Sequence, residues 1–144
     1  MHEAIHARLG EDENRYTASR RALVEVLISA RRPLSVDAIV TLAADLPRAS
    51  VYRNLAVLEQ SGVVRSIAGH DEFTRFELAE DLMGHHHHLA CRVCGVMVDV
   101  ELPGDVEAAL EQALARVARR AHFRTESHRL DMVGICASCG NKTG

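Results

Sequence analysis

Apolar residues recur at helical spacing in the first part of the chain. Thr17 precedes the stretch 18–30, whose apolar positions repeat every three or four residues, and Pro33 marks its end. A shorter helix is expected from Glu3 to Leu9, before the acidic run Glu11 to Glu13. The apolar stripe of the longer helix consists of Ala22, Leu23, Val26, Leu27 and Ala30.

Two more helical stretches follow directly. Ser35 can cap the stretch 35–46, which Pro47 stops. The next stretch, RASVYRNLAVLEQSG at 48–62, ends at Gly62. Their inward positions are Val36, Ile39, Val40 and Ala43 in the first helix, and Val51, Leu55 and Leu58 in the second.

After Gly62 the pattern becomes that of a hairpin. VVRSIA at 63–68 and FTRFEL at 73–78 read as strands joined by the turn Gly69-His70-Asp71. Three helices and a hairpin in this order form a winged helix, whose third helix suits the major groove of DNA. Candidate DNA contacts in the first turns of that helix are Ser50, Tyr52 and Arg53.

The second half of the chain alternates strands with one helix. HHLAC at 87–91 and VMVDVEL at 96–102 have strand patterns, 105–120 is an amphipathic helix, and 123–136 is extended. The inward face of that helix is expected to consist of Val106, Ala109, Leu110, Ala113, Leu114 and Val117.

These elements predict an α+β fold, with an N-terminal winged helix-turn-helix domain followed by a small α/β dimerisation domain with a structural zinc site. The expected divisions are 1–79 for the DNA-binding domain, 80–84 for a hinge, and 85–144 for the metal-binding and dimerisation domain. Units of about 70 to 80 residues seldom have a sufficient core, so a structural metal or a large dimer interface is expected.

The net charge of −3 hides a local excess of positive charge. Between Asn14 and Arg53, seven arginines face only Glu25, Asp37 and Asp45, a balance of 7 − 3 = +4. Such a stripe suits phosphate contacts, although a solvated arginine-rich face gives the same count. The sequence has no apolar run of membrane-spanning length and no signal-peptide pattern, so a cytoplasmic protein without membrane contact is expected.

Four cysteines occur as two CxxC pairs, Cys91 with Cys94 and Cys136 with Cys139. Two such pairs can complete a closed tetrahedral site of four thiolates, the type that structural zinc favours. A redox dithiol is the alternative for a single CxxC.

Four consecutive histidines, His85 to His88, lead into the first cysteine pair. In an extended segment His86 and His88 point to one face, and His85 and His87 to the other, so one strand can serve two metal sites. Imidazole suits zinc, iron(II), nickel and similar ions, so the residue types do not select the metal. A solvated histidine-rich loop is the alternative.

The run HHHHLACRVCG resembles the signature of the ferric uptake regulator family, in which alternating histidines precede the first CxxCG. ASVYRNLAVLEQSGVV is similar to the recognition helix and wing entry of that family, and FEL to its second wing strand. The resemblance implies a homodimeric, metal-responsive transcriptional repressor that binds an A·T-rich palindromic operator in double-stranded DNA and controls iron or zinc uptake genes.

The resemblance also implies metal ligands. Carried over, it assigns a regulatory site to Glu77, His86 and His88, and a second site in the dimerisation half to His85, His87, Glu107 and His128. The regulatory ion is expected to be Fe²⁺ or Zn²⁺, with Mn²⁺ and Ni²⁺ as further candidates, beside a structural Zn²⁺.

The chain departs from the family pattern at Pro33, where members often carry a ligating histidine. His70 in the wing turn is the hypothesis for the missing ligand, with Asp71 second. Asp99 resembles the aspartate that peroxide-sensing members supply to their regulatory metal, but an exposed strand residue is the alternative.

On the DNA side, Arg15 matches the family's basic residue that reaches an A·T-rich minor groove. Arg20 and Arg21 are expected to touch phosphates. A peroxide-sensing regulator and a metal-storage or metallochaperone module are the alternative functions. An enzyme is not expected, because the sequence lacks a nucleophile constellation and a phosphate-binding glycine loop.

Overall fold

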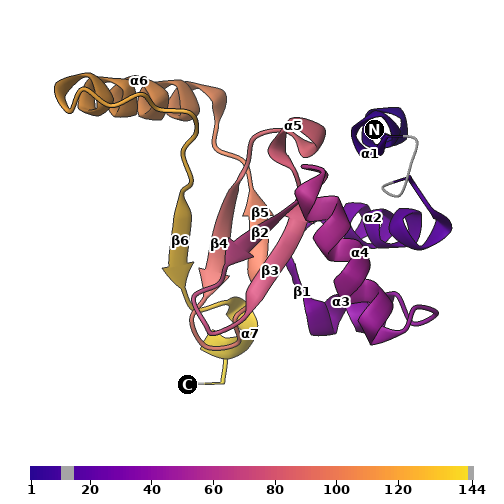
Figure 1. Cartoon of the computed structure of the whole chain (residues 1–144). Helices are drawn as coiled ribbons and strands as arrows, with labels where there is room; N and C mark the ends of the chain where they lie inside the picture. The colour runs from indigo at the N-terminus through magenta and orange to yellow at the C-terminus, as the bar shows by residue number, and fades with distance from the viewer. Residues whose placement is uncertain (11–14, 143–144) are drawn as a thin grey trace.

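Figure 1 shows the computed structural model, which describes residues 1–10 and 15–142. The acidic run Glu11 to Glu13 lies outside the described residues. The chain forms an N-terminal lobe of helices with a small sheet and a C-terminal lobe around a second sheet. The N-terminal lobe contains α1 (His2–Leu9), α2 (Ala18–Ala30), β1 (Leu34–Ser35), α3 (Val36–Leu42), α4 (Arg48–Gln60), β2 (Val64–Ala68) and β3 (Thr74–Leu78).

The predicted caps begin two of the helices. The side chain of Thr17 accepts a hydrogen bond from the backbone N–H of Arg20 at 3.3 Å, and Ser35 accepts one from Ala38 at 3.2 Å. Helix α3 ends at Leu42, short of the predicted end at 46. A tight turn closed by Leu46 N–H on the Ala43 carbonyl, at 2.9 Å, ends it before Pro47 is reached.

The predicted wing forms. Strands β2 and β3 pair antiparallel, with Val64 opposite Leu78 and Arg65 opposite Glu77. The two-residue strand β1, too short to predict from its pattern, adds to the other edge of β3. This sheet after α2, α3 and α4 confirms the winged helix, with α4 as its third helix.

One apolar core holds the N-terminal lobe together. It includes residues of every helix from α1 to α4 and of the wing, so the weakly patterned first helix is part of the domain. Its fully enclosed side chains include Ile5, Leu23, Ile39, Val51, Leu55 and Leu58.

The C-terminal lobe is built on β4 (His87–Cys91), which lies between β5 (Met97–Val100) and β6 (Asp131–Gly134). Strand β4 pairs antiparallel with β5 and parallel with β6. Helix α6 (Gly104–Arg120) lies between β5 and β6 in the chain, and α7 (Ala137–Gly140) follows β6. Within the predicted hinge, residues 80–83 form the short helix α5 (Glu80–Met83).

Helix α6 corrects a prediction. Its residues, all of them described, include none that is buried, and Val106 and Val117 are 46% and 63% exposed. Figure 1 shows the helix projecting from the end of the second sheet. The helical period identifies an apolar face, but in the described ranges no other element of this chain buries it.

The wing packs against one face of the second sheet. Ile67 of β2 forms a small apolar cluster with Ala90 and Met97. The guanidinium of Arg129 donates to the carbonyl of Ala68 at 3.1 Å, which ties the wing to the segment before β6. In the described ranges, every helix is too short or too polar to cross a bilayer.

Candidate metal centres

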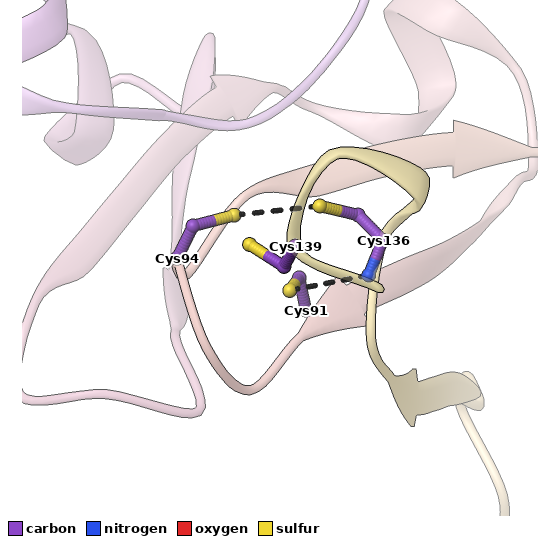
Figure 2. Close-up of side chains that lie close together, drawn as sticks. All are labelled: Cys91, Cys94, Cys136 and Cys139. Carbon is purple, nitrogen blue, oxygen red and sulfur yellow. Dashed lines mark hydrogen bonds between the residues drawn. The ribbon is translucent and has the colours of Figure 1, made fainter. Parts of the chain in front are cut away.

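The four cysteines come together at the end of the second sheet. Sulfur atoms of Cys91, Cys94, Cys136 and Cys139 lie within 4.8 Å of one another. The parallel pairing of Cys91 with Gly134 brings the two CxxC pairs side by side, although they are far apart in the sequence. Figure 2 shows the side chains converging from the end of β4 and the turn after it, and from α7 and the residue before it. Cys94 Sγ lies 3.7 Å from Cys136 Sγ.

The electrostatics of this cluster fit a dication. Backbone N–H groups of Cys136 and Cys94 lower the pKa of Cys91 to about 6, whereas side-chain contact with Cys136, together with burial, raises the pKa of Cys139 to about 12. Sulfurs this close resist further deprotonation because their negative charges repel one another. A zinc ion held by these residues would offset that repulsion, and four thiolates are a donor set that zinc prefers.

A second cluster joins the wing to the C-terminal lobe. Glu77 of β3, His86, His88 of β4 and Asp99 of β5 each offer a donor atom within 4.8 Å of the others. Glu77 Oε2 lies 3.1 Å from Nε2 of both His86 and His88, and Asp99 Oδ1 lies 3.8 and 3.7 Å from the same nitrogens.

Hydrogen bonds behind the two imidazoles orient them for an ion. Nδ1 of His86 lies 2.9 Å from the Gly84 carbonyl, and Nδ1 of His88 lies 3.3 Å from Asp131 Oδ1. With Nδ1–H donating to these oxygens, the lone pair of each Nε2 points at Glu77. This is the arrangement expected of histidines that ligate a metal.

Charge and burial in this cluster also fit a metal. Glu77 is only 5% exposed, and although burial opposes ionisation, His88, His86 and Arg65 lower its pKa to about 2. Burial raises the pKa of Asp99. Asp99 Oδ1 is buried without a hydrogen-bond partner among the described residues, and a cation beside it would satisfy that oxygen.

A third cluster lies on the other side of the histidine run. Donor atoms of His85, His87, Glu107 and His128 lie within 4.8 Å of one another. Glu107 Oε2 is 2.7 Å from His87 Nε2, and Glu107 Oε1 is 3.0 Å from His85 Nε2 and 3.1 Å from His128 Nε2. The histidines therefore alternate between two clusters, as the strand pattern predicts.

Two predicted residues lie elsewhere. His70 lies outside the Glu77 cluster, with its Nε2 3.2 Å from Oδ2 of Asp131, the residue behind His88. Asp71 pairs with Arg75, which lowers the pKa of that carboxyl to about 2. The fourth donor beside Glu77, His86 and His88 is instead Asp99, for which an exposed strand position was the alternative.

The expected DNA contacts are spread over the surface of the N-terminal lobe, with one exception. Arg15, Tyr52 and Arg53 are exposed, and Ser50 is partly buried. Arg20 is only 8% exposed, and its guanidinium donates to Asn54 at 3.1 Å and to the Arg15 carbonyl at 2.6 Å. We therefore do not propose Arg20 as a phosphate contact, because its side chain joins α2 to α4.

Three residues around the clusters were not foreseen. Asp131 supports His88, Glu80 contacts His85, and Arg65 contacts both Glu77 and Glu80. Each is an ordinary charged residue in its local sequence. Only the strand register and the α5 turn bring Asp131 and Glu80 to a histidine, and Arg65 to the two glutamates. A charged residue at a strand position, as at Arg65 and Asp131, is the one signal that the sequence holds.

Comparison with known proteins gives consistent matches. The model of the ferric uptake regulator family matches residues 11–133. The peroxide operon regulator of Bacillus subtilis is 34% identical over 146 residues, covering 99% of this chain and 94% of that protein. The ferric uptake regulation protein of Campylobacter upsaliensis is 33% identical over 95 residues, covering 66% and 56%.

A solved structure shows the same fold. The ferric uptake regulator of Vibrio cholerae superposes with a TM-score of 0.72 at 23% identity, covering 93% of this chain and 98% of that one. The family model extends over most of the chain, and the B. subtilis relative over nearly all of it. The chain therefore belongs to the ferric uptake regulator family.

Proposed function

We propose that this protein is a metal-dependent, DNA-binding transcriptional repressor that acts as a homodimer. The observation that carries the proposal is the position of Glu77, whose Oε2 is 3.1 Å from Nε2 of His86 and of His88. Glu77 belongs to the wing and the histidines to the C-terminal lobe, so a regulatory ion among them would restrain both lobes.

Restraining the lobes changes DNA binding through the geometry of the dimer. In a two-fold dimer, the angle between the lobes sets the distance between the two α4 helices, and DNA half-sites recur about one helical turn apart. An ion that binds the DNA-competent arrangement more tightly by about 1 to 3 kcal/mol strengthens DNA binding about 5- to 150-fold.

The DNA-binding surface would be formed by α4 and the residues before α2. Tyr52, which is 54% exposed, and Arg53 lie in the first half of α4, where side chains enter the major groove. Arg15 lies just before α2, and we propose that it reaches the minor groove of an A·T-rich palindromic operator.

The dimer would form through apolar surface that one chain leaves uncovered. Leu89 of β4 lies opposite Val98 of β5 and Met132 of β6, and all three are exposed. The apolar face of α6, with Val106 and Val117, is exposed as well. Contiguous apolar surface of this kind is typical of a protein interface.

The three clusters differ in their donor atoms, which suggests that the ions they bind have different roles. We propose that the cysteines hold a structural zinc ion, that the Glu77 cluster binds the regulatory ion, and that the His85 cluster holds a further one. Imidazole and carboxylate donors suit iron(II) and zinc, with manganese(II) and nickel(II) as further candidates. We propose that this switch controls metal uptake genes.

A peroxide-sensing regulator is the second candidate. Two observations favour it: the carboxylate of Asp99 belongs to the Glu77 cluster, and the B. subtilis relative is a peroxide operon regulator. In that case an iron(II) ion among these residues would be the oxidant-sensitive centre.

A DNA-binding assay tests the proposal. Zinc-loaded protein, titrated with each ion under nitrogen, should bind A·T-rich palindromic duplexes at least about fivefold more tightly than without the regulatory ion, and chelation should reverse the gain. Glu77→Gln should remove the gain, whereas Glu72→Gln, which makes the same change at an exposed position of the wing turn, should keep it.

Metal-independent binding to these duplexes in both variants would refute the metal switch. The same assay separates the two candidate functions. Peroxide should release DNA from the iron-loaded protein and leave the manganese-loaded protein bound if the protein senses peroxide. Equal resistance of both forms would favour regulation by metal supply.

A further inference from the structure

Arg65 on β2 lies between the two histidine clusters. Its Nε donates to Glu77 Oε1 at 2.6 Å, and a terminal nitrogen of the same guanidinium lies 2.5 Å from that oxygen. The other terminal nitrogen donates to Glu80 Oε2 at 3.2 Å. One arginine thus holds a carboxylate of the wing and a carboxylate of α5 at the same time.

Each of these carboxylates uses its second oxygen at a different cluster. Glu77 Oε2 faces His86 and His88, whereas Glu80 Oε1 contacts Nδ1 of His85. The other ring nitrogen of His85 lies 3.0 Å from Glu107, within the third cluster. An unbroken series of polar contacts therefore runs from Glu77 through Arg65 and Glu80 to His85.

Glu80 can act on His85 through the imidazole tautomer. A carboxylate that accepts from Nδ1–H keeps the lone pair on Nε2, and here Nε2 is the nitrogen that faces Glu107 and His128. Arg65 in turn directs one oxygen of Glu77 away from the histidines and leaves the other facing them. Both carboxylates are therefore oriented by the same guanidinium.

We propose that Arg65 is a positioning residue that couples the two metal clusters, so that an ion at one tightens binding of an ion at the other. The proposal rests on the proposed function, because it assumes that both clusters bind metal. Arg65 is not itself a ligand.

The sign of the coupling follows from which side chains are already fixed. The Glu77 side chain is almost fully buried, whereas Arg65 and Glu80 are partly exposed and have conformational freedom to lose. An ion bound to His85 would order the side chain of Glu80 and, through it, that of Arg65. Binding of a second ion at Glu77 then loses less conformational entropy, because Arg65 is already ordered. Repulsion between the two ions opposes this effect and is moderated by the carboxylates in both clusters.

A thermodynamic cycle separates this coupling from the effect that a change of charge at Arg65 has on each cluster alone. Zinc is first bound at the cysteines, and cobalt(II) binding is then followed by calorimetry. His128→Ala removes a ligand from the His85 cluster, and His86→Ala removes one from the Glu77 cluster. Each variant therefore gives the cobalt-binding constant of the cluster that remains intact. The coupling is the overall two-ion constant of the intact chain divided by the product of the two single-site constants.

The expected ratio for the native chain is at least about five. The ratio should fall close to unity when the same cycle is measured in Arg65→Gln, Arg65→Lys or Glu80→Gln. Each of these changes is combined in turn with His128→Ala and with His86→Ala. The lysine keeps the positive charge but lacks the planar fork that contacts two carboxylates. Arg124→Gln removes the same charge from an exposed arginine and should keep the native ratio.

A ratio near unity in the native chain, with cobalt bound at both clusters, would overturn the coupling and leave the metal switch intact. A native ratio that survives in Arg65→Gln would overturn the role of Arg65, because the coupling would then not pass through that residue. If neither cluster binds cobalt, the metal switch and the coupling both fail. Thermal unfolding of each variant confirms that it is folded, because a purely structural role would change stability without changing the ratio.

Discussion

At the scale of single residues, the site depends on one acid in an unusual place. Glu77 is buried on a strand, yet its pKa lies at about 2 because two histidines and Arg65 outweigh the effect of burial. A buried carboxylate that stays ionised beside imidazoles is a ready partner for a cation. The rest of the cluster is arranged around that charge.

The histidines of this cluster predict a dependence of metal binding on pH. Burial lowers the pKa of His86, but the Gly84 carbonyl and the Glu77 carboxylate outweigh it, so the pKa is raised. A protonated imidazole cannot ligate. Because the pKa is raised, protons compete with the ion already above the ordinary imidazole value of about 6.5.

Calorimetric titration at several pH values checks this. The affinity of the Glu77 cluster should fall as pH falls, by about tenfold per pH unit for each proton that the ion displaces. In His86→Gln the remaining affinity should depend less on pH. An affinity that stays constant through this range would contradict the prediction.

Residue chemistry was predictable where the residue type itself is informative. The cysteine pairs and the histidine run carry their own signal, and strand alternation by itself assigns each histidine to a face. Asp131, Glu80 and Arg65 carry no such signal, because their roles depend on which side chains the register and the α5 turn bring near. The expectation for Arg20 did not include its burial, since positive charge in a sequence does not distinguish a surface arginine from one that ties two helices together.

At the scale of elements, helical and strand periods specified the winged helix and the second half well. The pattern did not reveal β1, which has only two residues, or α5, which is a single short turn within the expected hinge. Helix α6 was identified by its period, but its apolar face was expected to be inward and is uncovered. A period reports that a face is apolar and says nothing about what covers it.

The end of the second sheet depends on the cysteines. Helix α7 is a single turn, so the link from Cys136 and Cys139 to Cys91 and Cys94 should hold it in place. Cys139→Ser is expected to weaken zinc binding by more than the roughly 10- to 100-fold that loss of an outer-shell partner costs.

Zinc content after dialysis against a graded series of chelator concentrations measures this loss, and the unfolding temperature should fall with it. Ser138→Ala, between the two cysteines and exposed, is the matched control and should retain zinc. Equal zinc retention in both variants would show that the four sulfurs do not act as one site.

At the scale of the whole molecule, the wing and the second sheet meet through a small apolar cluster and through the side chains of the Glu77 site. Among the described residues this buried apolar cluster consists of Ile67, Ala90 and Met97, so charged and metal-ligating groups have a large share in setting the angle between the lobes. Such an interface is well suited to switching, because the polar groups that define it respond to an ion.

The exposed face of α6 predicts the oligomeric state. Val117 is 63% exposed in one chain, so Val117→Glu costs the monomer little. At a dimer interface the same change buries an unpaired charge, and it should shift the protein towards monomer and weaken operator binding.

Analytical ultracentrifugation measures the shift. Gln112→Glu adds the same charge to an exposed position of the helix outside the predicted apolar stripe and should leave the dimer intact. A Val117→Glu protein that sediments like the native dimer would place the interface elsewhere.

The parallel pairing of β4 with β6 has a consequence for the order of synthesis. A ribosome releases the winged helix before β6, His128 and the second cysteine pair, because these segments follow it in the chain. Because N-terminal domains fold first during translation, a nascent or prematurely terminated chain would have a folded winged helix without the residues that complete its metal clusters. Because the second cysteine pair follows the winged helix in the chain, its synthesis is a condition for metal-regulated binding.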